Sequence, residues 1–466
     1  MGEGIELELT GIDLGDERLN RRSKKVLSAL ATDPQASINA ACTNWSDTLA
    51  AYRLFDNPAV EPEKILAPHQ AATLQRMQAQ PVVLVVQDTT ELDLTTHPPA
   101  DAGCLNRSNR FGLYDHTCLA LTPQRICLGV VGQQQFDRAP ESLGKTRERT
   151  HCPVESKESH RWLVGYRQAC ELAATCPQTQ VVSVADSEGD LYDIFVEAQQ
   201  HQTPADYLIR AKMNRSTPEL DPAAGPAVYR KVKDEVRATR VRLRKMIDLP
   251  QTPKREARRA RLHIRTLNVT VKPPHARSRL PQVNYNVVLV EEVAGPGDDT
   301  EVCWLLITSL PIDTPAQIEQ VISYYVARWQ IEVYFHVLKS GCNVEEIQLE
   351  AMHRVKNCLA FYKIIAWRIL YLTHLNRVCP TLPCDAAFDE AEWQAVWQVV
   401  KQQALPKRVP SLDVFMKLLT ELGGYNNRPG EPPPGPQVIW VSLRRMLDIT
   451  LAWQAFQKLH QKDVCK

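Results

Sequence analysis

The sequence lacks the features that mark membrane-inserted and exported proteins. Its 466 residues contain no run of 18 apolar residues, so we expect no membrane-spanning segment. The most apolar long stretch, Cys358 to Leu372, carries Lys363 and Arg368, and we interpret it as a core helix. The first residues, MGEGIELELT, have no basic start followed by an apolar run, which argues against a signal peptide.

Regularly spaced cysteines are missing as well. The 13 cysteines are an odd number at irregular spacings, and no Cys-x-x-Cys occurs. This pattern argues against a disulfide framework, and it disfavours a zinc site because zinc ligands usually come in closely spaced pairs. We therefore expect reduced thiols and a cytoplasmic location.

The composition is that of a globular protein with several domains. Hydrophobic residues make up 44% and charged residues 23% of the chain. At about 150 residues per domain, the length suggests two to four domains. The net charge is only +1, but between residues 229 and 272 there are fifteen Lys or Arg against four Asp or Glu. Such a local basic patch is typical of a phosphate-backbone partner, although a solvated surface is the alternative.

The hydrophobic pattern predicts an α/β protein. The first seventy residues have apolar positions at helical spacing. Short runs of Val and Leu at Val82–Val86 and Val181–Ala185 are typical of buried strands, and a helix is expected at 191–200 after the second run. Strands followed by helices in this way favour an α/β sheet.

A basic, β-rich segment is expected to interrupt this α/β region at about residues 212–300. From residue 239 to 245, Arg240, Arg242 and Arg244 alternate with Val241 and Leu243, which predicts a half-exposed strand with one basic face. Arg261, His263 and Arg265 alternate with Leu262 and Ile264 in the same way and predict a second such strand. Helix is predicted again from 315 to 329 and over most of the last hundred residues. The proline-rich stretch 428–436 is expected to be a surface loop.

Two aspartates follow the predicted buried strands. Asp88 comes after Val82–Val86, and Asp186 comes directly after Val181–Ala185. Ligands of open α/β sheets bind beyond the carboxyl ends of the strands, so both carboxylates are well placed for chemistry. The alternative is that each aspartate only caps a turn.

A third carboxylate lies among residues that bind phosphate. Tyr325, Arg328, Glu332 and Lys339 are spaced so that, on a helix of about 100° per residue, they fall within about 60° of one another. A carboxylate flanked by cations and a hydroxyl suits a metal-assisted phosphate site. An exposed helix with an Arg328–Glu332 ion pair is the alternative.

These four residues match the Tyr-x2-Arg-x3-Glu-x6-Lys signature, and the chain resembles bacterial transposases of insertion-sequence family four, the transposon-Five-like enzymes. Further matching strings occur in the same order: Leu14-Gly15-Asp16-x-Arg18, Ala51-Tyr52-Arg53, Asp88-Thr89-Thr90, Lys157-Glu158-Ser159-x-x-Trp162-Leu163, Asp186, Trp304-Leu305-Leu306 and Leu422-Gly423-Gly424. The resemblance covers nearly the whole chain.

The resemblance implies a ribonuclease-H-like catalytic domain over residues 71–372, with the β-rich insertion at about 212–300. It implies a helical domain that binds transposon ends at 1–70 and a helical dimerisation region at 373–466. The implied partners are double-stranded DNA, as transposon ends and as target, and a second copy of the chain in the synaptic complex. The implied location is cytoplasmic and nucleoid-associated, without a membrane.

The resemblance also implies cut-and-paste chemistry. Asp88, Asp186 and Glu332 are expected to hold two Mg²⁺ (or Mn²⁺) ions for cleavage and joining of DNA phosphodiesters through hairpin ends. Trp304 is expected to stack on a flipped base, unless it is simply a core residue. The residues expected to contact DNA are Tyr325, Arg328, Lys339, Trp304, Arg210, Arg18, Arg21, Arg22, Arg53, Arg240, Arg242 and Arg244.

Three other functions are compatible with some of these features. A domesticated metal-dependent nuclease has the same three carboxylates, so the sequence leaves it open. A non-catalytic inhibitor of transposition is disfavoured by the intact carboxylates and the N-terminal region. A glycosidase is disfavoured because a sugar needs no cluster of phosphate-binding cations.

Overall fold

The computed structural model describes residues 2–42, 44–138, 154–218, 230–249, 251, 255–297 and 300–464. Within these residues one nine-stranded sheet runs through the molecule in the order β3-β2-β1-β4-β5-β9-β8-β7-β6. The strands are β1 Val82–Asp93, β2 Gly112–Leu121, β3 Cys127–Phe136, β4 Gln180–Ala185, β5 Asp206–Arg210, β6 Leu243–Leu249, β7 Arg258–Val271, β8 Val283–Glu292 and β9 Cys303–Thr308.

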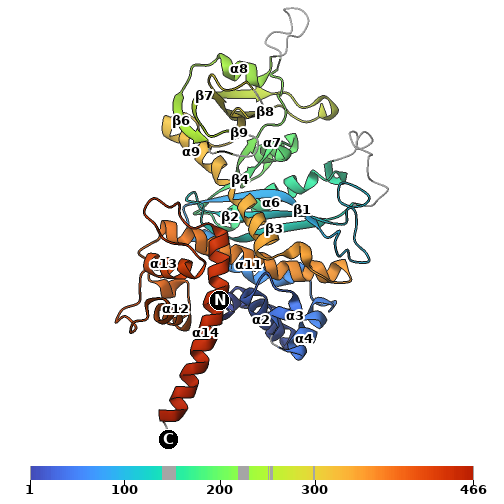
Figure 1. Cartoon of the computed structure of the whole chain (residues 1–466). Coiled ribbons are helices and arrows are strands. Elements are labelled where there is room, and N and C mark those ends of the chain that lie inside the picture. The colour runs from blue at the N-terminus through green and yellow to red at the C-terminus, as the bar shows by residue number, and fades with distance from the viewer. Residues whose placement is uncertain are drawn as a thin grey trace, which may run out of the picture.

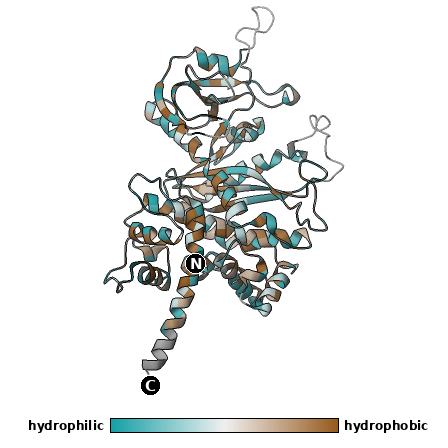
Figure 2. Ribbon diagram, viewed as in Figure 1, coloured by the Kyte–Doolittle hydropathy of each residue, from teal (hydrophilic) through white to brown (hydrophobic). Residues whose placement is uncertain are grey.

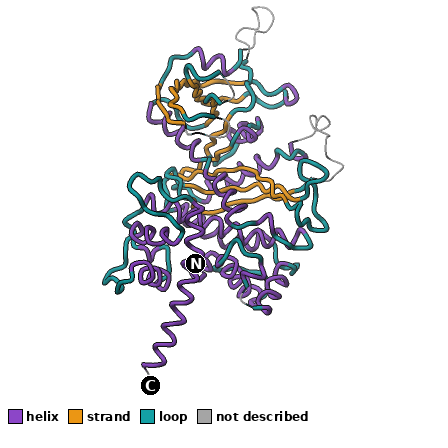
Figure 3. Tube along the Cα trace, viewed as in Figure 1, coloured by secondary structure: helices purple, strands orange, loops and turns teal. Residues whose placement is uncertain are grey.

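Helices surround the middle of this sheet (Figure 1). They are α1 Gly2–Glu6, α2 Glu17–Thr32, α3 Ile38–Ala41, α4 Trp45–Phe55, α5 Pro62–Gln78, α6 His160–Thr175, α7 Tyr192–Gln200, α8 Val232–Ala238, α9 Pro315–Ala327, α10 Gln330–His336, α11 Met352–Val378, α12 Glu390–Lys401, α13 Leu412–Leu422 and α14 Pro436–Val464. Figure 3 shows most helices below the central strands, with the insertion above them. The predicted α/β sheet with helical regions at both ends of the chain is confirmed.

The centre of the sheet combines parallel and antiparallel pairing. β1 pairs in parallel with β4, and β4 pairs in parallel with β5. On its other side β1 pairs antiparallel with β2 as far as Asp93, whereas its pairing with β4 ends at Val86. These central strands are buried because their Val- and Leu-rich runs are covered on both faces.

Each face of the sheet has its own hydrophobic core. One core gathers residues of α2, α5, α11 and the C-terminal helices against one face. The other gathers residues of α6 and α7 against the opposite face and extends into β7 and β8 of the insertion. In Figure 2 the hydrophobic colouring is accordingly strong in the strands and in the helix segments that meet them.

Helix α11 is the central helix of the larger core. It is long and apolar enough to cross a membrane, but 89% of its most apolar window is buried inside the protein. Lys363 is fully buried on it and forms an ion pair of 2.7 Å with Asp115 of β2. Trp367 donates a 2.8 Å hydrogen bond to the backbone oxygen of Cys127. The prediction of a core helix here is confirmed.

The N-terminal residues are tied to the sheet by a buried polar cluster. Glu8 accepts hydrogen bonds from His69 and Arg76 of α5. The other nitrogen of His69 accepts from the backbone N–H of Val130 on β3. Burial alone raises the pKa of Glu8, but the hydrogen bonds from His69 and Arg76 outweigh it and lower the pKa to about 2.

The insertion confirms one part of the predicted basic sheet and corrects another. On β7, exposed or half-exposed Arg261, His263 and Arg265 alternate with buried Leu262 and Ile264, as predicted. The predicted strand over 239–245 is wrong in its placement. β6 begins at residue 243, so Arg240 and Arg242 precede it and only Arg244 lies on it.

Part of the predicted insertion, residues 219–229, 250, 252–254 and 298–299, lies outside the described residues. The strand β9 that closes the insertion pairs with β5 of the central sheet. The predicted domain limits at residues 70 and 372 fall within α5 and α11, so each of these helices carries residues of two predicted domains.

The C-terminal region is helical, as predicted, and the stretch 423–435 before α14 has no helix or strand. Helix α14 extends away from the rest of the protein in Figure 1. Two apolar side chains on this projecting part are exposed, Leu451 at 55% and Phe456 at 63%.

The pKa of Glu8 leads to a prediction about stability. Because the folded pKa of about 2 lies below the ordinary 4.5, the ionised group stabilises the protein above pH 4.5, and this contribution is lost as the pH falls towards 2. We expect Glu8→Gln to destabilise the protein at pH 7 by about 3 kcal/mol, and the deficit to shrink in acid. Thermal unfolding between pH 3 and 7 measures this, with the exposed Glu63→Gln as control. Equal midpoints for Glu8→Gln and wild type at pH 7 would contradict it.

Candidate active site

Asp88 lies inside strand β1, whereas the sequence pattern predicted that it follows the strand. β1 continues to Asp93 because it keeps pairing with β2, and Asp88 is opposite Thr117. However, Asp88 lies two residues beyond Val86, where pairing with β4 ends. Its carboxylate therefore stands at the edge where the parallel partner stops, and 18% of its side chain is exposed.

Asp186 follows β4 directly, as predicted from the buried Val-rich run. Its carboxylate accepts a 2.7 Å hydrogen bond from the backbone N–H of Glu188 and so caps the short 3₁₀ turn Ser187–Gly189. Both the predicted position and the alternative, a capping role, are therefore seen at this residue.

The predicted single helix over residues 325–339 is wrong. α9 ends at Ala327, α10 begins at Gln330, and the backbone from Val337 to Gly341 is a π-helical turn. The assumed 100° per residue fails across these breaks. The predicted common face of the four signature residues therefore no longer follows from their spacing, and each must be placed by its own contacts.

Arg328 is the residue that joins the carboxylates. One of its terminal nitrogens is 3.0 Å from Oδ2 of Asp88, and the other is 2.7 Å from Oε1 of Glu332. The contact with Asp88 spans 240 positions of the chain. The predicted i,i+4 pair is thus real, but it is largely buried, with 11% of the Arg328 side chain exposed.

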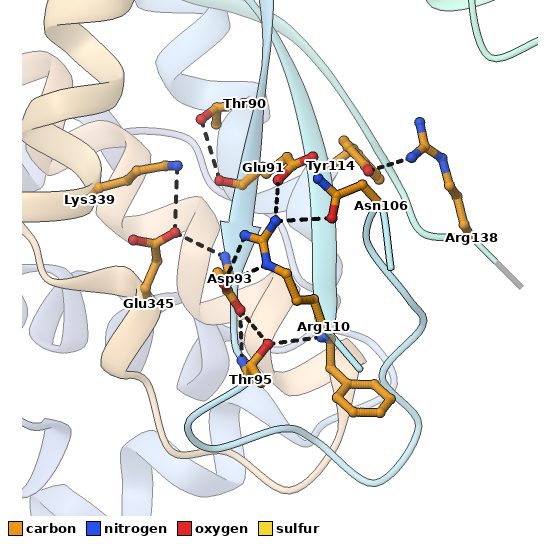
Figure 4. A network of polar contacts seen from close by, with 11 residues as sticks. Thr90, Glu91, Asp93, Thr95, Asn106, Arg110, Tyr114, Arg138, Lys339 and Glu345 are labelled. Carbon is orange, nitrogen blue, oxygen red and sulfur yellow. Dashed lines mark hydrogen bonds and ion pairs between the residues drawn. The ribbon is translucent and has the colours of Figure 1, made fainter. Parts of the chain in front are cut away.

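Lys339 contacts a different carboxylate, that of Glu345 (Figure 4). Its Nζ is 3.5 Å from Oε1 of Glu345, and the same oxygen accepts a 2.9 Å hydrogen bond from the backbone N–H of Asp93. Arg110 binds the carboxylates of Asp93 and Glu91 on the same strand. Lys339 is therefore held near the far end of β1, five residues beyond Asp88.

Tyr325 forms an aromatic and cationic cluster beside the carboxylates. Its ring lies 5.5 Å from that of half-buried Trp304, centroid to centroid. The guanidinium carbon of Arg328 is 5.9 Å from the Tyr325 ring centre. Burial raises the pKa of Tyr325, against the opposing charges of Arg328 and nearby Arg210. Four of the predicted DNA-binding residues are thus brought together.

The carboxylates strongly affect one another. Burial raises the pKa of Asp88, and the negative charges of Asp186 and Glu332 raise it further, to about 6. The charge of Arg328 and the N–H of Thr89 act in the opposite direction. Asp186 and Glu332 therefore both lie close enough to Asp88 for their charges to be felt.

The described residues contain no group of three His, Cys, Asp or Glu side chains already arranged to hold a metal ion. The donor chemistry nevertheless fits Mg²⁺ or Mn²⁺, because the three groups offer only oxygen atoms. Two of them already gather around one cationic group, the guanidinium of Arg328. A divalent cation at these carboxylates would compete with that guanidinium for their negative charge.

Sequence reasoning missed Arg161 of α6. Its Nε donates a 2.8 Å hydrogen bond to the hydroxyl of Thr89, and a terminal nitrogen is 2.8 Å from Glu188. It therefore connects the neighbour of Asp88 with the turn that Asp186 caps. Arg161 occupies one of the unspecified positions in the Lys157–Leu163 string, so only tertiary structure could single it out.

Sequence reasoning also missed Trp329, between α9 and α10. Its side chain is 59% exposed, although large aromatic residues are usually well buried. It is adjacent to Arg328 and three residues before Glu332. The helical pattern had placed it within one continuous helix, which hid the break that exposes it.

The remaining predicted DNA contacts are spread over the surface. Arg18, Arg21 and Arg53 are exposed on α2 and α4, and Arg22 is half-buried. Arg240 and Arg244 are exposed in the insertion, whereas Arg242 donates a hydrogen bond to the backbone oxygen of Asp313. The structure does not bring these residues into the carboxylate cluster.

Three family profiles match successive parts of the chain. The profile described as "Transposase DNA-binding" matches residues 2–60, "Transposase DDE domain" matches 167–368, and "Transposase Tn5 dimerisation domain" matches 364–453. The chain belongs to the Tn5-like DDE transposases. The transposase is an enzyme that cleaves DNA and transfers strands with a divalent metal, and its partners are DNA and a second copy of itself.

The DDE match contains Asp186 and Glu332 but starts after Asp88, so the role of Asp88 rests on the geometry above. Among solved structures, the transposase is similar to a piggyBac transposase in a synaptic complex with hairpin DNA. The sequence identity is 10%, the alignment covers 96% of this chain and 72% of that chain, and the TM-score is 0.34. A likeness at this level carries no argument about fold or chemistry.

The raised pKa of Asp88 leads to a second prediction. Because the folded pKa of about 6 exceeds the ordinary 3.8, the protonated form favours folding below pH 3.8, and that stability is lost as the pH rises through 6. Asn resembles the protonated form. In chelator, we therefore expect Asp88→Asn to be more stable than wild type at pH 7.5, by at most about 3 kcal/mol.

Thermal unfolding from pH 4.5 to 8 measures this difference, which should shrink in acid. Asp93→Asn on the same strand is a control of opposite sign, because the hydrogen bond from Thr95 and the charge of Arg110 overcome burial and lower the pKa of Asp93. An Asp88→Asn protein less stable than wild type at pH 7.5 would contradict the prediction.

Proposed function

We propose that the transposase works by cut-and-paste: it binds terminal inverted repeats, cleaves at the transposon ends and joins them to target DNA. Asp88, Asp186 and Glu332 are the catalytic carboxylates in this proposal. The observation that carries it is the guanidinium of Arg328 bound to both Asp88 and Glu332, because it unites two carboxylates from distant parts of the chain.

The proposed catalytic fold is ribonuclease-H-like. The strand order β3-β2-β1-β4-β5, with three antiparallel strands followed by two parallel ones, supports this assignment. So does the position of the carboxylates, on the central strand β1 and directly after the adjacent strand β4. The strands β6 to β8 then form the insertion between Asp186 and Glu332.

Two Mg²⁺ or Mn²⁺ ions at these carboxylates would activate a water or a 3′-hydroxyl and stabilise the leaving oxygen of an in-line displacement. The transposase's own side chains supply the phosphate binding. Arg328 and Arg210 both lie near Tyr325, and Arg328 also binds the carboxylates, so these three groups can bind the scissile phosphate. In this proposal Lys339 binds DNA near the far end of β1, where its contact with Glu345 places it.

The DNA path is proposed to run from Arg210 into the insertion. A hollow of about 770 Å³ there is lined by Arg210, Lys233, Arg237, His263 and Arg265 and also by acidic residues, including Glu291. Arg237 is bound to Glu291, and Arg265 lies 3.9 Å from the same carboxylate, so part of the positive charge is neutralised within the protein. Arg210 and the exposed arginines of β7 are therefore more available to bind phosphate than Arg237 and Arg265.

The exposed arginines of α2 and α4 are proposed to bind the transposon ends, within the segment matched by the DNA-binding profile. A hairpin on each end is the proposed intermediate, and the nucleoid of the cytoplasm is the proposed place of action. Trp304 and Trp329 are the two candidates for stacking on an unpaired base, and the exposed indole of Trp329 is the more accessible one.

Cleavage of DNA that carries the element's own ends tests the proposed carboxylates. With Mg²⁺, we expect wild type to cut at the boundary and Glu332→Gln to lose on the order of 10³-fold or more in rate, because a charged oxygen ligand is gone. The exposed Glu346→Gln serves as control. If wild type binds the ends but does not cut them, the protein is an inhibitory relative. If Glu332→Gln and Glu346→Gln cut equally well, Glu332 is not part of the catalytic site.

Replacement of Trp329 tests the stacking assignment. We expect Trp329→Ala to weaken the complex with a transposon end by about 1–3 kcal/mol, and Trp329→Phe to retain much of the affinity because it keeps an aromatic face. A 2-aminopurine base beside the cleavage site reports the stacking through its fluorescence. If Trp304→Ala abolishes that signal and Trp329→Ala leaves it unchanged, the assignment belongs to Trp304.

A further inference from the structure

The position of Arg328 has a consequence for metal binding. Its two terminal nitrogens bind oxygens that the proposed function assigns to the metal, one on Asp88 and one on Glu332. A guanidinium and a divalent cation compete for the same two carboxylates, because like charges a few ångströms apart repel strongly in a partly buried site. Arg328 and the metal therefore compete for one place.

The guanidinium is also incompletely satisfied where it lies. Its Nε is buried and has no hydrogen-bond partner among the described residues. A buried donor without a partner destabilises the arrangement that leaves it so. A phosphate oxygen is the strongest kind of acceptor for a guanidinium, and it would satisfy donors that the two carboxylates do not reach.

We propose that Arg328 is a displaceable counter-ion, which holds Asp88 and Glu332 together until it yields both carboxylates to a divalent cation and turns to a DNA phosphate. This inference rests on the proposed function, since it takes these carboxylates as metal ligands. Before the substrate binds, Arg328 thereby keeps Asp88 and Glu332 close to each other despite the repulsion between their negative charges.

The exchange couples metal binding to DNA binding. Without DNA, Arg328 gives up two ionic contacts when it leaves, so metal binding is weakened by that loss. With DNA, a phosphate replaces those contacts, and the metal binds more tightly. Because such coupling is reciprocal, metal must also tighten DNA binding. The transposase is thus least able to bind metal when no DNA is present to be cut.

Mn²⁺ binding to the full-length protein, followed by electron paramagnetic resonance without DNA, tests the proposal. We expect Arg328→Gln to bind Mn²⁺ roughly tenfold more tightly than wild type, because no guanidinium has to leave. Arg328→Lys should fall between the two, since an ammonium cannot bridge both carboxylates as a planar fork does. Arg110→Gln is the matched control: it removes a guanidinium that also binds two carboxylates, those of Glu91 and Asp93, outside the proposed metal site, and it should leave the affinity unchanged.

The variant Glu332→Gln separates failure of this inference from failure of the proposed function. If Glu332→Gln binds Mn²⁺ like wild type, the metal site itself is misassigned. If Glu332→Gln weakens binding but Arg328→Gln binds no more tightly than wild type, Arg328 is only a structural partner and the inference is overturned. The same holds if Arg110→Gln tightens binding as much as Arg328→Gln, because the effect is then one of overall charge.

Thermal unfolding with and without Mn²⁺ provides a second readout. Without metal, Arg328→Gln should melt below wild type because its carboxylates repel without a counter-ion. Saturating Mn²⁺ should raise its midpoint by more than it raises that of wild type, in proportion to the tighter binding. If Arg328→Gln does not fold without metal, Arg328→Lys carries the test, and a metal-induced shift no larger than that of wild type contradicts the proposal.

Discussion

Repulsion between three carboxylates is the constraint on which the site depends. Asp88, Asp186 and Glu332 come close enough that burial and their mutual charge raise the pKa of Asp88 to about 6. The structure tolerates this because Arg328 binds two of them directly. A cluster of this kind is costly for the folded protein alone and useful only when a cation or a phosphate takes part.

The rest of the fold holds these groups in place against that repulsion. β1 is paired with β4 as far as Val86 and with β2 past Asp88, which holds Asp88 beside the end of the strand that precedes Asp186. Helix α11 anchors the sheet from below through the buried pair of Lys363 and Asp115, and Glu8 ties the N-terminal residues to α5. The break between α9 and α10 brings Glu332 and Arg328 towards β1 and leaves Trp329 exposed beside them. The family's DNA-binding, catalytic and dimerisation regions thus share one hydrophobic core.

Arg328 and Lys339 show how the same residue type is used in two ways. Both belong to the signature, yet Arg328 lies between the carboxylates and Lys339 lies against Glu345 near the far end of β1. The two cations are thus separated along β1, one bound to Asp88 and Glu332 and the other to Glu345. In the insertion, similarly, Arg237 is bound to Glu291, whereas Arg261 is exposed on its strand. A count of basic residues therefore overstates the number of free phosphate ligands.

Local pattern alone determined much of this protein. The Val-rich runs predicted β1 and β4, and the charged residues within the apolar stretch at 358–372 predicted a buried helix. Alternation predicted β7, and the signature pointed to the family and to Glu332. Tertiary structure alone decided that Asp88 lies within a strand, because β2 extends the pairing. It also decided where the helix breaks before Glu332, and that Arg161 and Trp329 lie beside the site. The physical reason is that strand length, helix breaks and ion pairs depend on partners far away in the chain, which no local periodicity records.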